Sequence, residues 1–307
     1  MDSSSDEHQP MQVFIYLADV NRGLQFLQLG MAIIIMSSSG TLGRYIDLPA
    51  SMTIWIRCVI GALALLLVLL AAGIEWRFKS KGNKTLIWSS IFLGVHWVTY
   101  FYSLQLSTVA LGMLSLFTYP VITVLLEPLI LKVKFQKMSV FLGCFAFVGI
   151  AFLIPELSLE NEHSLGIAVG VVSAFFYSIR NILLKKQVAD QSGITIMFHQ
   201  LVINSVLLIP FLFLIELPTM DVVIGQWKPL LLLALFTTAA GHTLLVLSFR
   251  YFSISTASVL TSLVPLVGIF LGFLFLSEVP GGKTYIGGGM ILLTVIVESV
   301  LSARRGG

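Results

Sequence analysis

Residues 50–73 read ASMTIWIRCVIGALALLLVLLAAG, a stretch of 24 residues in which Arg57 is the only charge. A helix of about 20 apolar residues crosses the roughly 30 Å hydrocarbon core of a bilayer. The run is continuous, does not alternate with polar residues and is too long for a barrel strand, so it is typical of a membrane helix. The stretch therefore predicts a transmembrane helix.

Nine further stretches of the 307-residue chain have the same character. With residues 50–73 they predict ten transmembrane helices, at residues 25–43, 50–73, 85–104, 107–131, 138–154, 164–184, 194–215, 229–249, 253–276 and 283–301. The composition agrees, because only 11% of the residues are charged, whereas a soluble domain carries about 25%. We therefore predict an all-α integral membrane protein.

Lysine and arginine are distributed unevenly between the two sides of the predicted bundle. If both termini are cytoplasmic, 13 of these residues lie on the inner side and 3 lie on the outer side. Basic residues accumulate in the short cytoplasmic loops of membrane proteins. We predict a multi-pass protein of the cell (inner) membrane with residues 1–24 and 302–307 as cytoplasmic segments. The first of these lacks the features of a signal peptide.

The second half of the chain repeats the first. An offset of 145 residues places Pro120 on Pro265. Each copy, 25–154 and 164–301, holds five predicted helices. Because five is odd, the second copy enters the membrane from the opposite side. The sequence thus predicts two inverted five-helix repeats.

A family pattern runs through both halves. In the second half it consists of Gly241, Ser255-Thr256-Ala257-Ser258, Leu263-Val264-Pro265-Leu266, Leu276-Ser277-Glu278 and Gly287-Gly288-Gly289. A weaker copy in the first half includes Tyr119-Pro120-Val121 and Gly143. The pattern resembles the EamA repeat of the drug/metabolite transporter superfamily over residues 25–301.

The resemblance implies ten helices and a central substrate pathway between the repeats. It also implies export or exchange of amino acids, nucleotide-type metabolites or drugs. Arg57 resembles the arginine often found on the family's second helix. Val133 stands in the first half where Glu278 stands in the second, so the resemblance supports no role for this acid in both copies.

Pro120 and Pro265 fall near the centres of the fourth and ninth predicted helices. A mid-helix proline removes a hydrogen bond and kinks the helix, and paired interruptions near the midplane mark the binding region of inverted-repeat transporters. We predict that these prolines act as hinges, although prolines are also simply common in membrane helices.

His96 falls at the middle of the third predicted helix, and Tyr100 shares its face at i+4. His242 falls at a similar depth on the eighth helix, and Arg57 about two turns into the second. Ionisable groups at such depths line cavities or pair with one another. We predict that all four bind substrate, with Arg57 holding a carboxylate. Neutral core histidines, and an Arg57 that snorkels outward or forms an ion pair, are the alternatives.

Four more residues are candidates for the substrate pathway. Trp97 and Tyr119 lie too deep in the predicted helices for an aromatic belt at the membrane interface. We predict that they form an aromatic wall of a pocket, and ordinary helix packing is the alternative. Tyr177 and Arg180 share a face of the sixth helix, with snorkelling of Arg180 as the alternative.

Two further residues are candidates for proton coupling. Glu127 lies near the cytoplasmic end of the fourth helix and His199 near the cytoplasmic edge of the seventh. Histidine titrates close to neutral pH, and a carboxylate does so when burial raises its pKa. For Glu127 an interfacial pair with nearby lysines is the competing interpretation.

No catalytic motif, no cofactor motif and no metal-ligand spacing is present in the sequence, and no basic region is interleaved with aromatics for nucleic acid. We predict a secondary transporter and not an enzyme, most simply an exporter that favours amino acids by alternating access. Its partners are a small-molecule substrate, lipid and, if it is coupled, protons, and the chain is a monomer or homodimer. The alternatives are proton-coupled drug efflux, an intramembrane enzyme and a non-transporting sensor.

Overall fold

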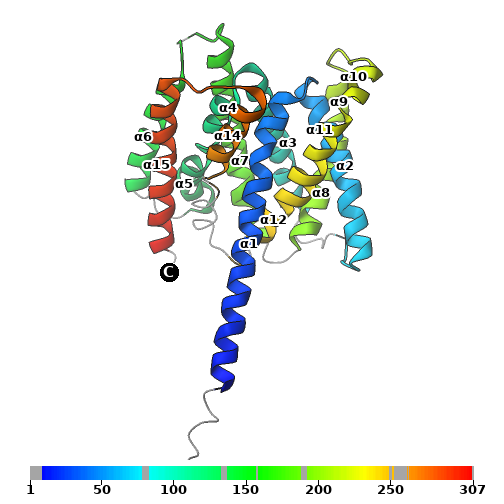
Figure 1. Ribbon diagram of the computed structural model, residues 1–307, viewed down its shortest axis with the longest axis vertical. Coiled ribbons are helices and arrows are strands. Elements are labelled where there is room, and N and C mark those ends of the chain that lie inside the picture. Colours follow the sequence, from blue (N-terminus) through cyan, green and yellow to red (C-terminus); the bar gives the residue numbers. More distant parts are fainter. Residues whose placement is uncertain are drawn as a thin grey trace, which may run out of the picture.

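The computed structural model describes residues 9–77, 83–132, 137–156, 158–187, 192–248, 251, 261 and 263–305 (Figure 1). Within these ranges the regular structure is entirely helical and contains no strand. The predicted all-α class is therefore confirmed.

Six helices make up the first half of the chain. They are α1 (Gln9–Tyr45), α2 (Ala50–Ala71), α3 (Asn83–Leu106), α4 (Val109–Leu116), α5 (Tyr119–Leu131) and α6 (Lys137–Leu153). The second half begins with α7 (Glu162–Gln187), α8 (Gly193–Leu207), α9 (Ile209–Leu212), α10 (Met220–Gly225) and α11 (Trp227–Leu231). It continues with the π-helix η2 (Leu232–His242), α12 (Thr243–Ser248), α14 (Leu263–Leu276) and α15 (Gly282–Arg305).

Among the described residues, five helical stretches are long and apolar enough to cross a membrane: Gly23–Tyr45, Ala50–Ala71, Val109–Ile130, Glu162–Leu184 and Trp227–Ser248. The stretches Val140–Leu153, Gly193–Leu207 and Leu263–Leu276 are apolar but shorter. The predicted helix 194–215 is too long, because α8 ends at Leu207 and the chain turns at Leu208, two residues before Pro210. At the front, α1 begins at Gln9 and not at residue 25, with Pro10 in its first turn, where proline is tolerated.

The predicted helix 107–131 is divided in two. Thr108 caps α4 by accepting a hydrogen bond from the backbone N–H of Leu111 (3.2 Å), and the chain turns at Phe117–Thr118 before α5 begins. Pro120 therefore lies in the first turn of α5, where its missing N–H would have no helical partner. The break lies one turn before Pro120 and within the single apolar stretch Val109–Ile130, so the role of Pro120 as a hinge stays a prediction. Pro128 is the proline inside α5.

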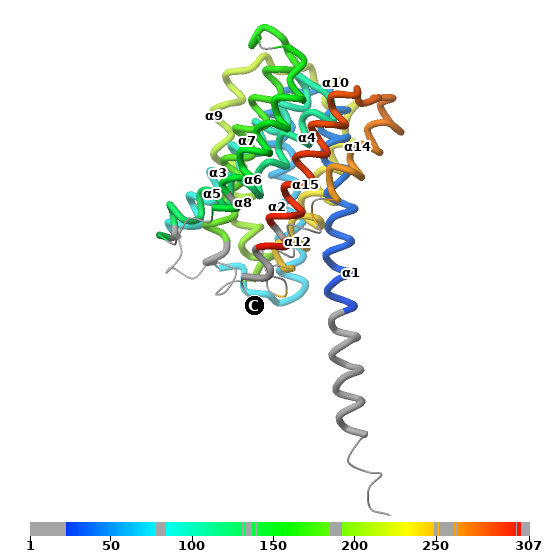
Figure 2. The backbone as a smooth tube through the Cα atoms, turned by 90° about the vertical axis from the view of Figure 1, so that its left-hand side faces the viewer, coloured from blue at the N-terminus to red at the C-terminus, as the bar shows by residue number. Residues whose placement is uncertain are grey.

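The helices pack with contacts between the two halves of the chain. α3 lies along α7, α2 along α8, α6 along α15, and α1 along η2, α12 and α14. Figure 1 shows α6 beside α15 and α8 beside α2, and Figure 2 shows the same bundle turned by 90°. Between α6 and α15 the approach is close, since a Cβ at Gly287 would lie 2.5 Å from the Gly149 carbonyl oxygen. The halves therefore form one bundle.

Polar and apolar side chains are distributed as in a membrane protein. Large apolar residues such as Leu67, Phe141 and Phe275 are exposed around the bundle, whereas Arg57 and Arg180 are fully buried inside it. A continuous apolar exterior fits lipid and not water. Arg57 and Arg180 thus place positive charge inside the bundle, next to the candidate site.

Candidate functional site

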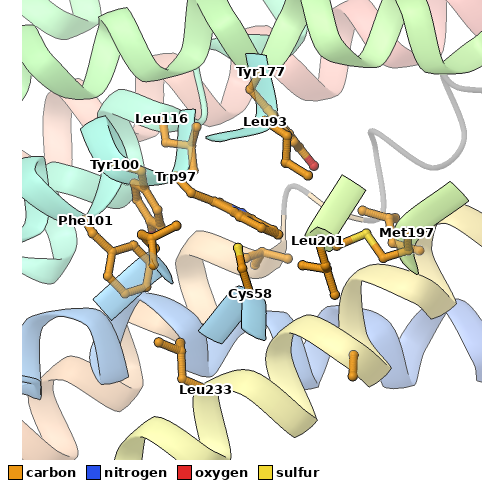
Figure 3. Packing of buried hydrophobic residues seen from close by; sticks show 14 of the residues in the cluster. Cys58, Leu93, Trp97, Tyr100, Phe101, Leu116, Tyr177, Met197, Leu201 and Leu233 are labelled. Atoms are coloured by element: carbon orange, nitrogen blue, oxygen red, sulfur yellow. The ribbon is translucent and has the colours of Figure 1, made fainter. Parts of the chain in front are cut away.

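A cavity of about 50 Å³ lies in the centre of the bundle. Its lining residues are Met36, Ser39, His96, Trp97, Tyr100, Met113, Leu116, Phe117, Tyr119, Tyr177, His242, Leu245, Thr261 and Val264. This volume holds a few water molecules and no metabolite. Figure 3 shows the Trp97 indole in the middle of the surrounding cluster, with Cys58 of α2 on one side and Tyr177 of α7 on the other.

Most of the predicted substrate-binding residues meet at this cavity although they come from distant parts of the chain. Those that line it are His96, Trp97, Tyr100, Tyr119, Tyr177 and His242. The two arginines lie outside the lining, Arg57 against Trp97 and Arg180 near Tyr177.

His96 is fixed by a reciprocal contact between α3 and α7. The hydroxyl of Ser173 donates to the backbone carbonyl oxygen of His96 (2.8 Å), and the same hydroxyl oxygen lies 2.7 Å from Nδ1 of the ring. Because the single hydroxyl proton is used on the carbonyl, Nδ1–H is the donor in the second contact. In the neutral ring Nε2 is then an acceptor. The ring stacks on Tyr177 at a centroid distance of 4.3 Å.

Arg57 is buried against aromatic rings. Its Nε donates to the hydroxyl of Thr238 on η2 (2.7 Å), and its guanidinium carbon lies 4.2 Å from the Trp97 centroid and 5.3 Å from the Phe101 centroid. Nη1 and Nη2 have no hydrogen-bond partner among the described residues. Full burial excludes the predicted alternative of outward snorkelling.

The energetic position of Arg57 is unusual. Removing a guanidinium from water costs several kcal/mol, whereas a desolvated cation–π contact returns about 2 kcal/mol. In the described part of the chain no carboxylate lies within 4.0 Å of this guanidinium. The two ring contacts therefore leave the charge of Arg57 incompletely compensated.

Arg180 is also surrounded by neutral groups. Its Nη2 donates to Oε1 of Gln200 (2.7 Å) and its Nη1 to Oδ1 of Asn181 (3.1 Å), whereas Nε has no partner in the described ranges. Gln200 in turn donates to the hydroxyl of Ser89 (3.1 Å). The network fixes Arg180 between α7, α8 and α3 without neutralising it.

Two lining residues come from irregular points of their helices. The π-helix η2 ends with His242, whose ring meets Trp97 edge-on at 5.2 Å and whose Nδ1 has no partner in the described structure. Tyr119 follows the break between α4 and α5, and its hydroxyl lies 3.2 Å from that of Thr261. π-Helical segments and helix breaks of this kind occur often at functional sites.

Besides the two arginines, four predicted residues lie outside the lining. Glu127 is half-buried on α5, and His199 on α8 donates from Nδ1 to the carbonyl oxygen of Thr195 (2.8 Å). Pro120 is buried next to Tyr119, and Pro265 is buried next to Val264, which does line the cavity. Among the described residues no group of three or more His, Cys, Asp or Glu side chains could hold a metal.

The structure adds contacts that the sequence analysis did not identify. Ser173 and Thr238 hold His96 and Arg57 from the other half of the chain. At one end of the bundle Glu278 accepts a hydrogen bond from the Val109 N–H (2.7 Å) and lies 3.5 Å from Nε of Arg44. Burial raises the pKa of the Glu278 carboxyl, against the lowering by the Val109 N–H and Arg44.

Known proteins resemble this chain along most of its length. The pattern of the EamA-like transporter family matches residues 25–154 and 164–300. The uncharacterized transporter YyaM of Bacillus subtilis is 25% identical over 262 residues, which are 82% of this chain and 84% of that protein. The pseudopaline exporter CntI of Pseudomonas aeruginosa is 23% identical over 252 residues, 82% of this chain and 87% of that protein.

The fold also has a solved counterpart. A crystal structure of a protein superposes with a TM-score of 0.65 at 15% identity and covers 93% of this chain and 99% of that one. This likeness concerns the fold. The family match extends over both halves of the chain, the relatives are transporters, and the exterior of the bundle is apolar. The protein is thus an integral membrane protein that belongs to the EamA-like transporter family.

Proposed function

We propose that this protein is a secondary transporter of the cell membrane, built from two inverted five-helix repeats, that exports a small metabolite by alternating access about the central cavity. The repeats correspond to residues 25–154 and 164–301, and both termini face the cytoplasm. The N-terminal end of α1 and the C-terminal end of α15 lie at the same end of the bundle (Figures 1 and 2), as this topology requires.

The helix packing supports the inverted repeat. In the inverted repeat, α1 corresponds to α7, and α3 corresponds to η2 and α12. Exchanging these partners turns the contact of α3 with α7 into the contact of η2 and α12 with α1, and both contacts exist. The contact of α1 with α14 likewise becomes that of α7 with α4 and α5. Three contacts, α2 with α8, α6 with α15, and α4 with α14, map onto themselves. Two halves related by a two-fold axis in the membrane plane produce this pattern.

The backbone conformation supports the inverted repeat independently of the helix packing. Lys132 and Ser277 are the non-glycine residues of positive φ, at 57° and 55°, among the described residues. They follow α5 and α14 directly and are separated by 145 residues, the offset that relates Pro120 to Pro265. Positive φ is costly for residues with a Cβ, so its occurrence at two equivalent helix ends argues for equivalent folding of the two halves.

The proposal rests mainly on which helices contribute residues to the cavity wall. The lining comes from α1, α3 and the α4–α5 pair in the first half, and from α7, the η2–α12 pair and the α14 region in the second. These are corresponding elements of the two repeats. A site enclosed by both halves can open to either side when one half rocks against the other.

Export is supported by a relative whose name states a direction, the pseudopaline exporter. We propose a substrate with a carboxylate, because Arg57 and Arg180 stand at the wall, and amino acids are the class that the sequence analysis favoured. Glu127 and His199 lie outside the cavity lining, so proton coupling through them requires a route other than the cavity.

Counterflow in proteoliposomes tests the proposal. Vesicles loaded with one unlabelled metabolite at a time should accumulate the labelled form only when the protein and a true substrate are present. His96→Ala should reduce this flux, whereas Phe141→Ala, on the exposed surface of α6, should retain it. Absence of flux across amino acids, organic acids and nucleosides, with binding intact, would contradict a transporter and favour a sensor.

A further inference from the structure

The buried charge around the cavity is positive. Arg57 and Arg180 are fully buried, and both touch aromatic lining residues. Within the ten predicted spans the sequence contains just two acidic residues, Glu127 and Glu298, and neither lines the cavity. In the described part of the chain no carboxylate lies within 4.0 Å of either guanidinium. Uncompensated charge in a membrane interior is costly and marks a ligand site.

Unpartnered polar groups of two residues lie around Trp97. The donors Nη1 and Nη2 of Arg57 and the ring nitrogen Nδ1 of His242 lack partners among the described residues, and both side chains contact Trp97. A carboxylate offers two acceptor oxygens to the paired N–H groups of a guanidinium, a geometry that lysine cannot match. One carboxylate would therefore supply both the missing hydrogen bonds and the missing negative charge.

The same surroundings reject an ammonium group. No acidic side chain lines the cavity to receive one, and two guanidinium groups repel it. Aromatic faces can bind ammonium groups, but the Trp97 face is occupied by Arg57 and the Tyr177 ring is stacked on His96. The lining thus lacks a negative side chain to balance the second charge of a zwitterionic amino acid, and the guanidinium groups beside Trp97 and Tyr177 oppose an ammonium group at those rings.

We propose that the substrate is an organic carboxylate with an apolar or aromatic body and no ammonium group, and that Arg57 receives its carboxylate. This inference narrows the proposed substrate to carboxylates without an ammonium group, and it departs there from the amino acids that the sequence favours. It rests on the proposed function for translocation but not for binding. The cavity of about 50 Å³ is too small for such an anion, so binding moves the Trp97 indole aside and uncovers the guanidinium. The apolar lining residues, such as Met113 and Leu116, receive the body of the substrate.

Three compounds with one phenethyl body separate the charge states: 3-phenylpropionate (anion), phenylalanine (zwitterion) and 2-phenylethylamine (cation). Binding to the purified full chain is measured by ligand-induced thermal stabilisation, and transport by counterflow. We expect 3-phenylpropionate to stabilise the protein and to exchange, with affinity at least about tenfold above the other two. The proposal would be overturned if phenylalanine or the amine bound as well as 3-phenylpropionate. It would also be overturned if, in a panel extended to aliphatic mono- and dicarboxylates, no compound bound better than the amine.

Variants assign the effect to Arg57. Arg57→Gln should lose at least about tenfold in affinity for the anion, and Arg57→Lys should lose most of it despite the retained charge. Should Arg57→Gln fail to fold, Thr238→Val keeps the charge and removes the bond to Nε together with the bond from the same hydroxyl to the Leu233 carbonyl. A smaller selective loss of anion affinity is then expected. Unchanged anion affinity in a folded variant at position 57 refutes the site. Anion binding that depends on Arg57 without any flux would instead refute transport and leave the site intact.

Discussion

The guanidinium carbon of Arg57 lies 4.2 Å from the centroid of the Trp97 ring, so that α2 and α3 share a buried contact at the wall of the central cavity. The indole is 1% exposed and also meets His242 from η2. Trp97 therefore joins a charge of the first half to a histidine of the second. Its position makes it both a structural element of the core and the side chain that covers the proposed anion site.

Truncation of this side chain should have a large effect. Trp97→Ala removes a fully buried ring and exposes the guanidinium to the cavity, and we expect a loss of about 3–5 kcal/mol in unfolding free energy together with loss of flux. Denaturation of the purified protein and counterflow measure the two effects. Trp88→Ala, on the exposed face of α3, is the matched control and should change stability by about 0.5 kcal/mol or less. Equal losses in both variants would refute the structural role of Trp97.

The hydroxyl of Ser173 is expected to be required for the orientation of His96. Ser173→Ala leaves the buried Nδ1–H of His96 without its 2.7 Å partner, at a cost of about 1–3 kcal/mol, and frees the ring to change tautomer. Ser37→Ala is the control, because the buried Ser37 hydroxyl bonds only the Ile33 carbonyl of its own helix in the described structure. The melting temperature and the initial rate of flux should both be lower than those of wild type for Ser173→Ala, and both should remain near wild type for Ser37→Ala.

The α6–α15 contact should not tolerate a side chain. A Cβ at Gly287 meets the backbone oxygen of Gly149 at 2.5 Å, and backbone cannot move aside as a side chain can. We expect Gly287→Leu to lower stability by about 3 kcal/mol or more, or to abolish accumulation in the membrane. Gly289→Leu faces open space and should be tolerated. Normal yield and melting temperature for Gly287→Leu would contradict this packing.

Glu278 should make stability depend on pH. Burial raises the pKa of its carboxyl, against the lowering by Val109 and Arg44. A raised pKa in the folded state means that the folded protein binds the proton more tightly than the unfolded chain does, so this stabilisation is present at acidic pH and lost as the pH rises through the folded-state pKa. The Tm of wild type relative to Glu278→Gln should therefore decrease with increasing pH. If the Tm of wild type relative to Glu278→Gln increased with pH instead, this prediction would be contradicted.

The fold follows from the sequence further than the site does. Runs such as residues 50–73 determine helices because each backbone polar group must be satisfied within its own segment in lipid, and α2 occupies Ala50–Ala71. The break before Tyr119 was not predictable, since a proline such as Pro120 is compatible with a mid-helix kink and with a first turn alike. α4 and α5 both pack against α7, and such tertiary contacts cannot be read from the local sequence.

The candidate site, too, could be predicted only in part from the sequence. His96 and Tyr100 could be grouped from their spacing on one helix face, and both line the cavity. Their partners could not, because the Ser173 hydroxyl and the Thr238 hydroxyl belong to the other half of the chain. Serine and threonine in membrane helices usually bond their own helix, and no local pattern identifies the few that reach across.

The accessibility of a cavity residue from the two sides of the membrane tests the central claim most directly. In a protein carrying Cys58→Ala and Cys144→Ala, the substitution Ser39→Cys places one thiol in the cavity wall. A membrane-impermeant thiol reagent should label it in both right-side-out and inside-out vesicles, and a transported substrate should slow both reactions. Labelling from one side alone, or labelling that no substrate slows, would contradict a cavity that opens alternately between the two halves.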